Sequence, residues 1–281
     1  MMYTEQYKGI NYNDGQTAQV VDVLAIEVPL AIAVNGVPFT VTMQTPGQEM
    51  ELVRGLLFSE NIFRSTDVQP VMTITGKDAA GFINAVSVSI PPHLVLKDFA
   101  GTRNVISASS CGICGKTEIE SDEQQPIQNT LILEPALVPA MFEQVSQHQK
   151  TFQQSGGTHA AGAFTIDGTF LVVMEDIGRH NAVDKVIGYL LDHQLLEKAK
   201  CITVSGRISF EIVGKAKAAG IPFLMAVSAP STLAVDKAQE GGISLLAFCR
   251  NKKLTVYSNP GNVATEQQGM VTGHVKHQNH V

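Results

Sequence analysis

The chain has little of what secreted, membrane-spanning or nucleic-acid-binding proteins require. Its four cysteines in 281 residues are too few for a disulfide framework. The most apolar stretch, residues 20–34, is interrupted by Asp22, Glu27 and Pro29, so we expect no membrane span there. The 20 lysines and arginines are outnumbered by 26 acidic residues, which excludes the basic excess of a general polynucleotide binder. The first 13 residues lack the basic and apolar regions of a signal peptide. We therefore expect a cytoplasmic protein that binds neither nucleic acid nor membrane.

Two of the cysteines, Cys111 and Cys114, stand close together in the run SSCGICGK at residues 109–116. Small residues without an apolar period can bring a thiol to a partner rather than bury it. The thiolate is the reactive form, and a nearby cation such as Lys116 favours it. In a reducing compartment this spacing leaves three chemistries open: a redox dithiol, half of a metal site, or a sulfur relay. Two unreactive loop cysteines are the structural alternative.

Several metal and redox sites do not fit the rest of the sequence. A structural zinc site needs two further ligands at close spacing, and none follows in the part expected to be ordered. Residues 115–123 carry no helical stripe, whereas a thioredoxin-like pair opens a helix. A zinc deaminase would have glutamate two residues after histidine, but His159 is followed by two alanines. We therefore expect no tightly held metal.

The first part of the chain reads as a small α+β domain, residues 20–97, preceded by a loose tail up to about residue 19. Asn35-Gly36 is a strong hairpin signal. Thr45-Pro46 is typical of a helix cap followed by proline at the first helical position. Residues 98–130, which carry the cysteine pair, are expected to be a mobile connection because loops of this length are otherwise uncommon. The expected elements are strands at 24–34, 37–43, 71–75 and 82–90 and a helix at 48–58.

The second part, residues 131–260, alternates between strands and helices. This spacing predicts an α/β domain with parallel strands and right-handed crossover helices. Residues 261–281 are polar and end in histidines 274, 277 and 280, so a disordered tail is expected. The expected elements are helices at 139–153, 181–191, 210–219 and 232–238 and strands at 163–166, 170–174, 201–204, 223–227, 243–248 and 254–257.

Three junctions in this second part place glycine beside histidine or arginine: GGTH at 156–159, EDIGRH at 175–180 and SGRIS at 205–209. Ligands collect at the carboxyl ends of parallel strands, where helix N-termini offer free N–H groups. Glycine lets the backbone approach an anion, and the arginine fork suits phosphate. Each histidine alone could instead be a structural residue. Together the junctions predict a phosphate-bearing ligand, with Gly156, Gly157, His159, Arg179, His180 and Arg207 as candidate contacts.

Five segments in order resemble the FdhD-type accessory proteins of formate dehydrogenase. They are CGIC at 111–114, GGTHAA at 156–161, EDIGRHNAVDK at 175–185, SGRISFE at 205–211 and FCR at 248–250. The resemblance covers most of residues 20–260 and excludes the histidine-rich tail. It implies a larger C-terminal domain with the three-layer fold of cytidine deaminase, without its zinc chemistry.

The resemblance further implies a homodimeric sulfur carrier, or sulfurtransferase, that accepts a persulfide from a cysteine desulfurase. The sulfur would pass to the molybdenum cofactor in its bis(molybdopterin guanine dinucleotide) form before insertion into formate dehydrogenase. Cys111 would carry the persulfide, and Cys114 would assist. Persulfide transfer resembles thiol–disulfide exchange and needs an accessible thiolate. Cofactor binding is implied for Phe248, Cys249, Arg250, Asn251, Lys252 and Lys253, with backbone contact favoured at Cys249.

Two other functions remain open beside the one that the resemblance implies. One is a non-catalytic chaperone that binds and delivers the cofactor while the cysteines only close over it. The other is a dithiol oxidoreductase that cycles a disulfide between Cys111 and Cys114.

Overall fold

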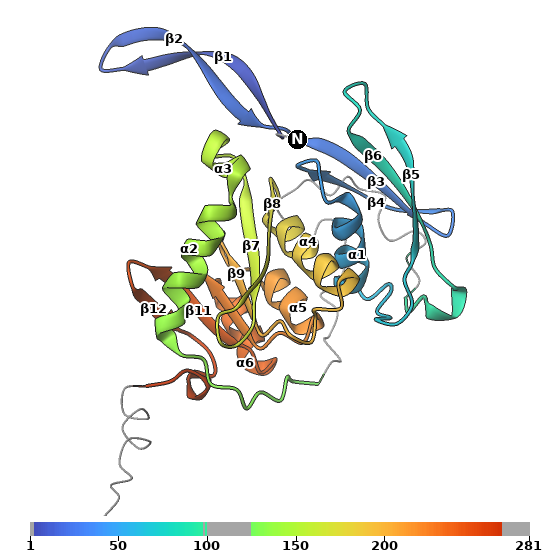
Figure 1. Cartoon of the computed structure of the whole chain (residues 1–281), viewed down its shortest axis with the longest axis vertical. Coiled ribbons are helices and arrows are strands. Elements are labelled where there is room, and N and C mark those ends of the chain that lie inside the picture. Colours follow the sequence, from blue (N-terminus) through green and yellow to red (C-terminus); the bar gives the residue numbers. More distant parts are fainter. Residues whose placement is uncertain (1–2, 98, 100–124, 266–281) are drawn as a thin grey trace, which may run out of the picture.

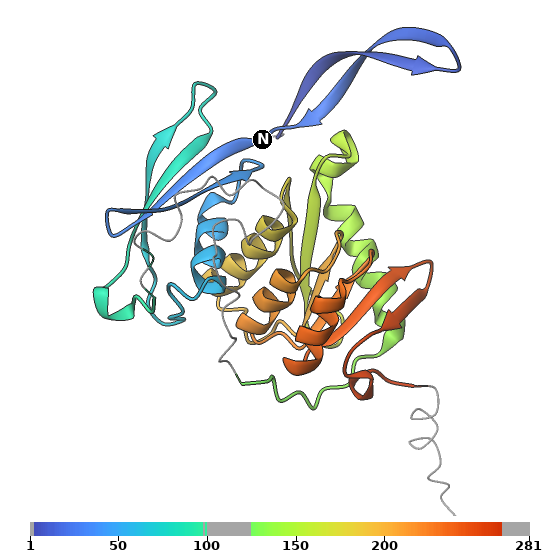
Figure 2. The same cartoon turned by 180° about the vertical axis from the view of Figure 1, so that it is seen from behind.

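The chain begins with a two-stranded ribbon that stands away from the rest of the molecule (Figures 1 and 2). The computed structural model describes residues 3–97, 99 and 125–265. In the ribbon β1 (Thr4–Asn13) pairs with antiparallel β2 (Gln16–Ala25). The prediction of a loose tail up to about residue 19 is therefore wrong. The turn at Asp14-Gly15 has two positive φ angles, 48° and 80°, which is the turn chemistry of a short hairpin.

A four-stranded sheet with strand order β4-β3-β6-β5 follows the ribbon. Helix α1 (Glu49–Ser59) packs on one face, where Leu52, Val53 and Leu57 are buried with Leu30 and Ile32 of the sheet. The hairpin at Asn35-Gly36 is confirmed. The predicted strand 24–34 is wrong as one element, because β2 ends at Ala25 and the next strand begins at Val28. The strands are β3 (Val28–Val34), β4 (Val37–Gln44), β5 (Val71–Lys77) and β6 (Ile83–Ser89).

A six-stranded sheet with strand order β12-β11-β10-β9-β7-β8 forms the larger part. Its parallel strands are β9 (Cys201–Val204), β10 (Phe223–Ala226) and β11 (Ser244–Arg250). Antiparallel partners are β7 (His159–Phe164), β8 (Phe170–Asp176) and β12 (Lys253–Val256). The predicted alternation of strands and helices is thus confirmed, in a mixed rather than wholly parallel sheet.

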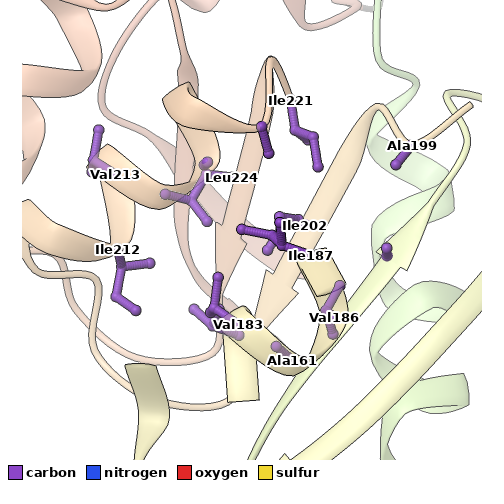
Figure 3. Close-up of a cluster of buried hydrophobic side chains, with 14 of the residues drawn as sticks. Ala161, Val183, Val186, Ile187, Ala199, Ile202, Ile212, Val213, Ile221 and Leu224 are labelled. Atoms are coloured by element: carbon purple, nitrogen blue, oxygen red, sulfur yellow. The ribbon is translucent and has the colours of Figure 1, made fainter. Parts of the chain in front are cut away.

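Helices cover both faces of this sheet. The core shared with α4 (Arg179–Asp192), α5 (Phe210–Ala218) and α6 (Thr232–Glu240) contains Val183, Ile187 and Ile212 packed on Ile202 and Leu224 (Figure 3). Helix α2 (Val138–His148) packs on the opposite face. Within the described residues, no helix has both the length and the apolar character needed to cross a membrane.

Two boundaries of the second part differ from expectation. The single helix predicted at 139–153 is wrong, because the chain breaks at Gln149 between α2 and α3 (Lys150–Ser155). The first residues of the expected tail also belong to the fold. Asn262 accepts a backbone hydrogen bond from Leu133, which in turn accepts one from Ala264. The remainder of the tail, residues 266–281, lies outside the described residues.

The two parts of the chain meet where α1 crosses α4 (Figure 1). A Cβ atom at Gly55 would overlap the backbone carbonyl of Asp184, and one at Gly188 would overlap that of Glu51. The paired glycines therefore permit a backbone-to-backbone approach that no other residue allows.

Candidate functional site

The predicted junctions lie along one edge of the six-stranded sheet. Strands β8, β9, β10 and β11 end at this edge, and the antiparallel strand β7 begins there. Helices α4, α5 and α6 start from the loops that follow β8, β9 and β10. Their free N–H groups therefore face the same edge, an arrangement that favours anions.

The structure brings His159, Arg179 and His180 together around the loop after β9. The hydroxyl of Ser205 accepts a hydrogen bond from the backbone of Ala160 at 2.9 Å and lies 3.5 Å from Nδ1 of His159. A Cβ at Gly206 would lie 3.3 Å from Nδ1 of His159 and 3.4 Å from Cδ of Arg179. Glycine at this position therefore lets the three elements close together.

The protonation of His159 is set by its burial and by neighbouring positive charges. Burial lowers the pKa of His159 from 6.5, and the charges of Arg179 and His180 lower it further, so its imidazole is neutral at pH 7. Arg207, in the loop after β9, is exposed at the same edge. The group thus offers arginine cations beside a neutral histidine, which suits a phosphorylated ligand.

The segment EDIGRH also has a structural task that the sequence analysis missed. The buried carboxylate of Asp176 lies 2.8 Å from Nζ of Lys185 and accepts hydrogen bonds from Gly178, Asn181 and Thr45. Burial raises the pKa of Asp176, and Lys185 and the hydrogen bonds from Gly178 and Asn181 oppose that shift. A lysine among the apolar residues of a buried helix was the signal that could have indicated this cluster.

Thr45 is held by this cluster and does not cap α1 as predicted. Its hydroxyl accepts a hydrogen bond from the backbone of Ile177 at 3.1 Å, and its carbonyl accepts one from Lys185 at 2.9 Å. The residue at the helix cap is Gln48, without a side-chain cap. Thr45 therefore ties the four-stranded sheet to the entrance of α4, where Arg179 and His180 lie.

Glu175 fixes the segment before His159. Its carboxylate accepts hydrogen bonds from the backbone N–H groups of Thr151 and Phe152, in the first turn of α3, and from the hydroxyl of Thr158 at 2.8 Å. Gly156 and Gly157 follow α3 and are exposed. They adjoin the root of the ribbon, since a Cβ at Gly157 would lie 3.3 Å from that of Ala25.

The segment implied for cofactor binding forms the turn between β11 and β12. Asn251 and Lys252 have φ angles of 52° and 60°, as a two-residue hairpin requires. Phe248 has a φ of 54°, an outlier for an aromatic residue of the kind often found at functional sites. A cavity of about 370 Å³ lies here, lined by Phe248, Arg250, Asn251, Lys253, Leu254 and Thr255.

Cys249 does not line this cavity. Its side chain is 5% exposed and belongs to the core on the α2 face of the sheet. Burial raises the pKa of its thiol to about 12, so the group is an unreactive thiol at neutral pH. Lys252, at the tip of the turn, is exposed.

A loop that the sequence analysis missed joins the two groups of candidate residues. In the loop after β10, Ala229 accepts a backbone hydrogen bond from Ile208 at 3.1 Å, and Ser228 accepts one from Phe248 at 3.3 Å. Ser231 caps α6 through a bond from Ala234. The serines that flank Ala229-Pro230 after a buried strand were the available signal.

The predicted catalytic residues Cys111 and Cys114 lie outside the described residues. Within the described part of the chain, no cluster of three or more His, Cys, Asp or Glu side chains could hold a metal ion.

Comparisons with known proteins agree on one family. Residues 25–264 match the model of the FdhD/NarQ family. The chain is 41% identical over 271 residues to "Sulfur carrier protein FdhD" of Mycolicibacterium paratuberculosis, covering 94% of this chain and 100% of that protein. It is 39% identical over 274 residues to the protein of the same name in Streptomyces avermitilis, covering 93% and 96%. Its fold is similar to that of a protein from Desulfotalea psychrophila assigned as a formate dehydrogenase accessory protein, with a TM-score of 0.71, 22% identity and coverage of 93% and 100%. The chain belongs to the FdhD/NarQ family.

Proposed function

We propose that this protein is a sulfur carrier that serves formate dehydrogenase. It accepts a persulfide from a cysteine desulfurase on Cys111, assisted by Cys114, and sulfurates the bis(molybdopterin guanine dinucleotide) molybdenum cofactor before its insertion into the enzyme. Family membership and the names of the relatives support the sulfur-carrying role. The observation that carries the cofactor part is the sheet edge, where residues distant in sequence form two groups suited to phosphorylated ligands.

The two groups of residues would contact different parts of the cofactor. At the turn between β11 and β12, Phe248 offers an aromatic ring to a guanine base, and Arg250 and Lys253 offer cations to phosphate. At the loops after β8 and β9, Arg179 and Arg207 offer forks for further phosphate oxygens. The cofactor is a substrate rather than a resident group, and the protein binds it through its two nucleotides.

The sulfur step is a transfer without net oxidation. The thiolate of Cys111 attacks the outer sulfur of the donor persulfide, the bond between the two donor sulfurs breaks, and the donor cysteine leaves as a thiolate. Cys111 then carries the extra sulfur in a new sulfur–sulfur bond. A cysteine that performs this exchange needs access to two partners in turn.

Three finer proposals accompany this function. The domain at 131–260 has the three-layer arrangement of cytidine deaminase, and the helices on both faces of its sheet support this relation. The chain acts as a cytoplasmic homodimer, as the resemblance implies. The domain at 20–97 contributes to the site through Thr45.

The test is the intact mass of the protein after incubation with a cysteine desulfurase and cysteine. We expect the mass of one added sulfur, located on Cys111 and absent from Cys111→Ala, which should still bind guanosine diphosphate. Cys249→Ser is the matched control and should gain sulfur like the wild type. A protein that binds nucleotide but never gains sulfur is the chaperone. One that forms only a Cys111–Cys114 disulfide is the oxidoreductase.

A further inference from the structure

Three side chains from the N-terminal ends of α4 and α5 contact one another at the sheet edge. Nε2 of His180, in the first turn of α4, lies 3.2 Å from the hydroxyl of Ser209 and 3.8 Å from a carboxylate oxygen of Glu211. His180 and Glu211 are largely buried, with side chains 12% and 17% exposed. We infer that Glu211, together with Ser209, is a positioning residue for the cofactor's phosphate groups and acts through His180.

Ser209 provides the first argument, because it does not do what its place in the chain suggests. It is the residue before the first turn of α5, where serine usually accepts a hydrogen bond from the helix backbone. Its side chain makes no such bond. The hydroxyl is instead next to Nε2 of His180. Helix α5 therefore begins without a side-chain capping bond, and the hydroxyl of Ser209 contacts His180 instead.

The charge of Glu211 provides the second argument. The neighbouring His180 and the hydroxyl of Ser209 lower its pKa to about 2 against the opposing effect of burial, so the group is a carboxylate at any physiological pH. A carboxylate beside an anion site repels the ligand unless it orients a neighbouring hydrogen-bond donor. Here it faces His180, while Arg179, the neutral His159 and the buried Asp176 are the other ionisable groups around these histidines.

A structural explanation of Glu211 makes the opposite prediction. An acidic residue in the first turn of a helix is stabilised by the helix dipole whatever lies nearby. If that were its purpose, removing the negative charge would leave phosphate binding unchanged or tighten it. If Glu211 fixes His180 for the ligand, removing the charge weakens binding. The sign of the effect therefore separates the two explanations.

The inference rests on the proposed function, and guanosine diphosphate is the probe. We expect Glu211→Gln to weaken its binding, measured by calorimetry, by about fivefold, the size of one ion pair near the surface. Ser209→Ala should weaken binding less. Glu240→Gln, which removes an exposed carboxylate at the far end of α6, is the matched control and should bind like the wild type. In a His180→Ala background Glu211→Gln should have no further effect, since the two residues act as one unit.

Unchanged or tighter binding by Glu211→Gln overturns the inference, as does an undiminished effect in the His180→Ala background. If the wild type does not bind guanosine diphosphate, the proposed cofactor site is refuted. The relation between Glu211 and His180 is then tested by a second measurement. The imidazole resonances of His180, followed by NMR in the free protein, should change position in Glu211→Gln and stay in place in Glu240→Gln. Resonances of His180 that are identical in Glu211→Gln and the wild type would show that Glu211 does not act on His180.

Discussion

Nζ of Lys185 lies 2.8 Å from Oδ2 of Asp176, and neither side chain has any solvent exposure. The pair sits beneath the entrance of α4, where it also holds the backbone of Thr45 from the first part of the chain. A single buried ion pair therefore connects the four-stranded sheet to the edge that carries Arg179 and His180. The geometry at this edge of the sheet therefore depends on a buried ion pair that lies beneath it.

Lys185→Met should destabilise the fold by about 3–5 kcal/mol, because it leaves the buried carboxylate of Asp176 without its cation. The midpoint of urea unfolding measures the change. Lys198→Met removes an exposed lysine and is the control, with an expected change within about 0.5 kcal/mol. The double variant Lys185→Met, Asp176→Asn removes the unpaired charge and keeps an acceptor oxygen for the buried donors around Asp176, so it should recover part of the loss. A double variant no more stable than Lys185→Met would show that the unpaired charge is not the cause.

The alternation of the second part could be predicted from the sequence because each element there carries its own local pattern of apolar residues and turn residues. The buried cluster could not, since Thr45 and Asp176 are 131 residues apart and no local pattern relates them. The ribbon was missed for a different reason. Its strands have no buried face, so the periodicity that indicates a strand was weak, and the Asp14-Gly15 turn was the remaining signal.

The same distinction applies to the candidate site. Arg179, His180 and Arg207 follow strands directly, and their gathering at one edge follows from parallel topology. Glu211 and Ser209 were present in the segment that matched the family, but their relation to His180 needs coordinates from two loops. Phe248 was named from the resemblance alone, and its φ angle is visible only in the structure.

Gly188→Ala should destabilise the protein by about 3 kcal/mol, because the added Cβ would overlap the backbone carbonyl of Glu51 and force α1 away from α4. Thermal unfolding gives the comparison. Gly261→Ala places its Cβ in open space at an ordinary φ and should change little. Equal stability of both variants would mean that the two helices can separate without cost.

The lowered pKa of His159 makes folding sensitive to acid. Just below pH 6.5 the unfolded chain binds a proton at this residue that the folded protein does not, so stability is full above 6.5 and falls as the pH drops. His159→Gln should remove this part of the acid sensitivity. Urea unfolding at a series of pH values would show the free energies of variant and wild type converging in acid. Parallel profiles would contradict the prediction.

Arg179→Ala and Arg207→Ala should each weaken the binding of guanosine diphosphate by about tenfold, the loss of one arginine–phosphate contact. Neither should reduce the sulfur gained by Cys111, because the persulfide step does not use the sheet edge. Lys198→Ala is the control for lost positive charge. Unchanged affinity in both arginine variants would remove the phosphate assignment from this group of residues.

Phe248 combines a strained backbone with an aromatic ring that packs against the core. Phe248→Gly and Phe248→Ala both remove the ring from the cavity and from this packing, but only glycine allows the φ of 54° without strain, so we expect the alanine variant to be less stable than the glycine variant by about 1 kcal/mol. The glycine variant should bind guanosine diphosphate about tenfold more weakly if the ring stacks on the base, since a stacked base contributes about 1–3 kcal/mol. Phe248→Tyr keeps ring and strain and should match the wild type in both measurements. A glycine variant that binds with unchanged affinity would show that the aromatic ring of Phe248 has no part in holding the nucleotide.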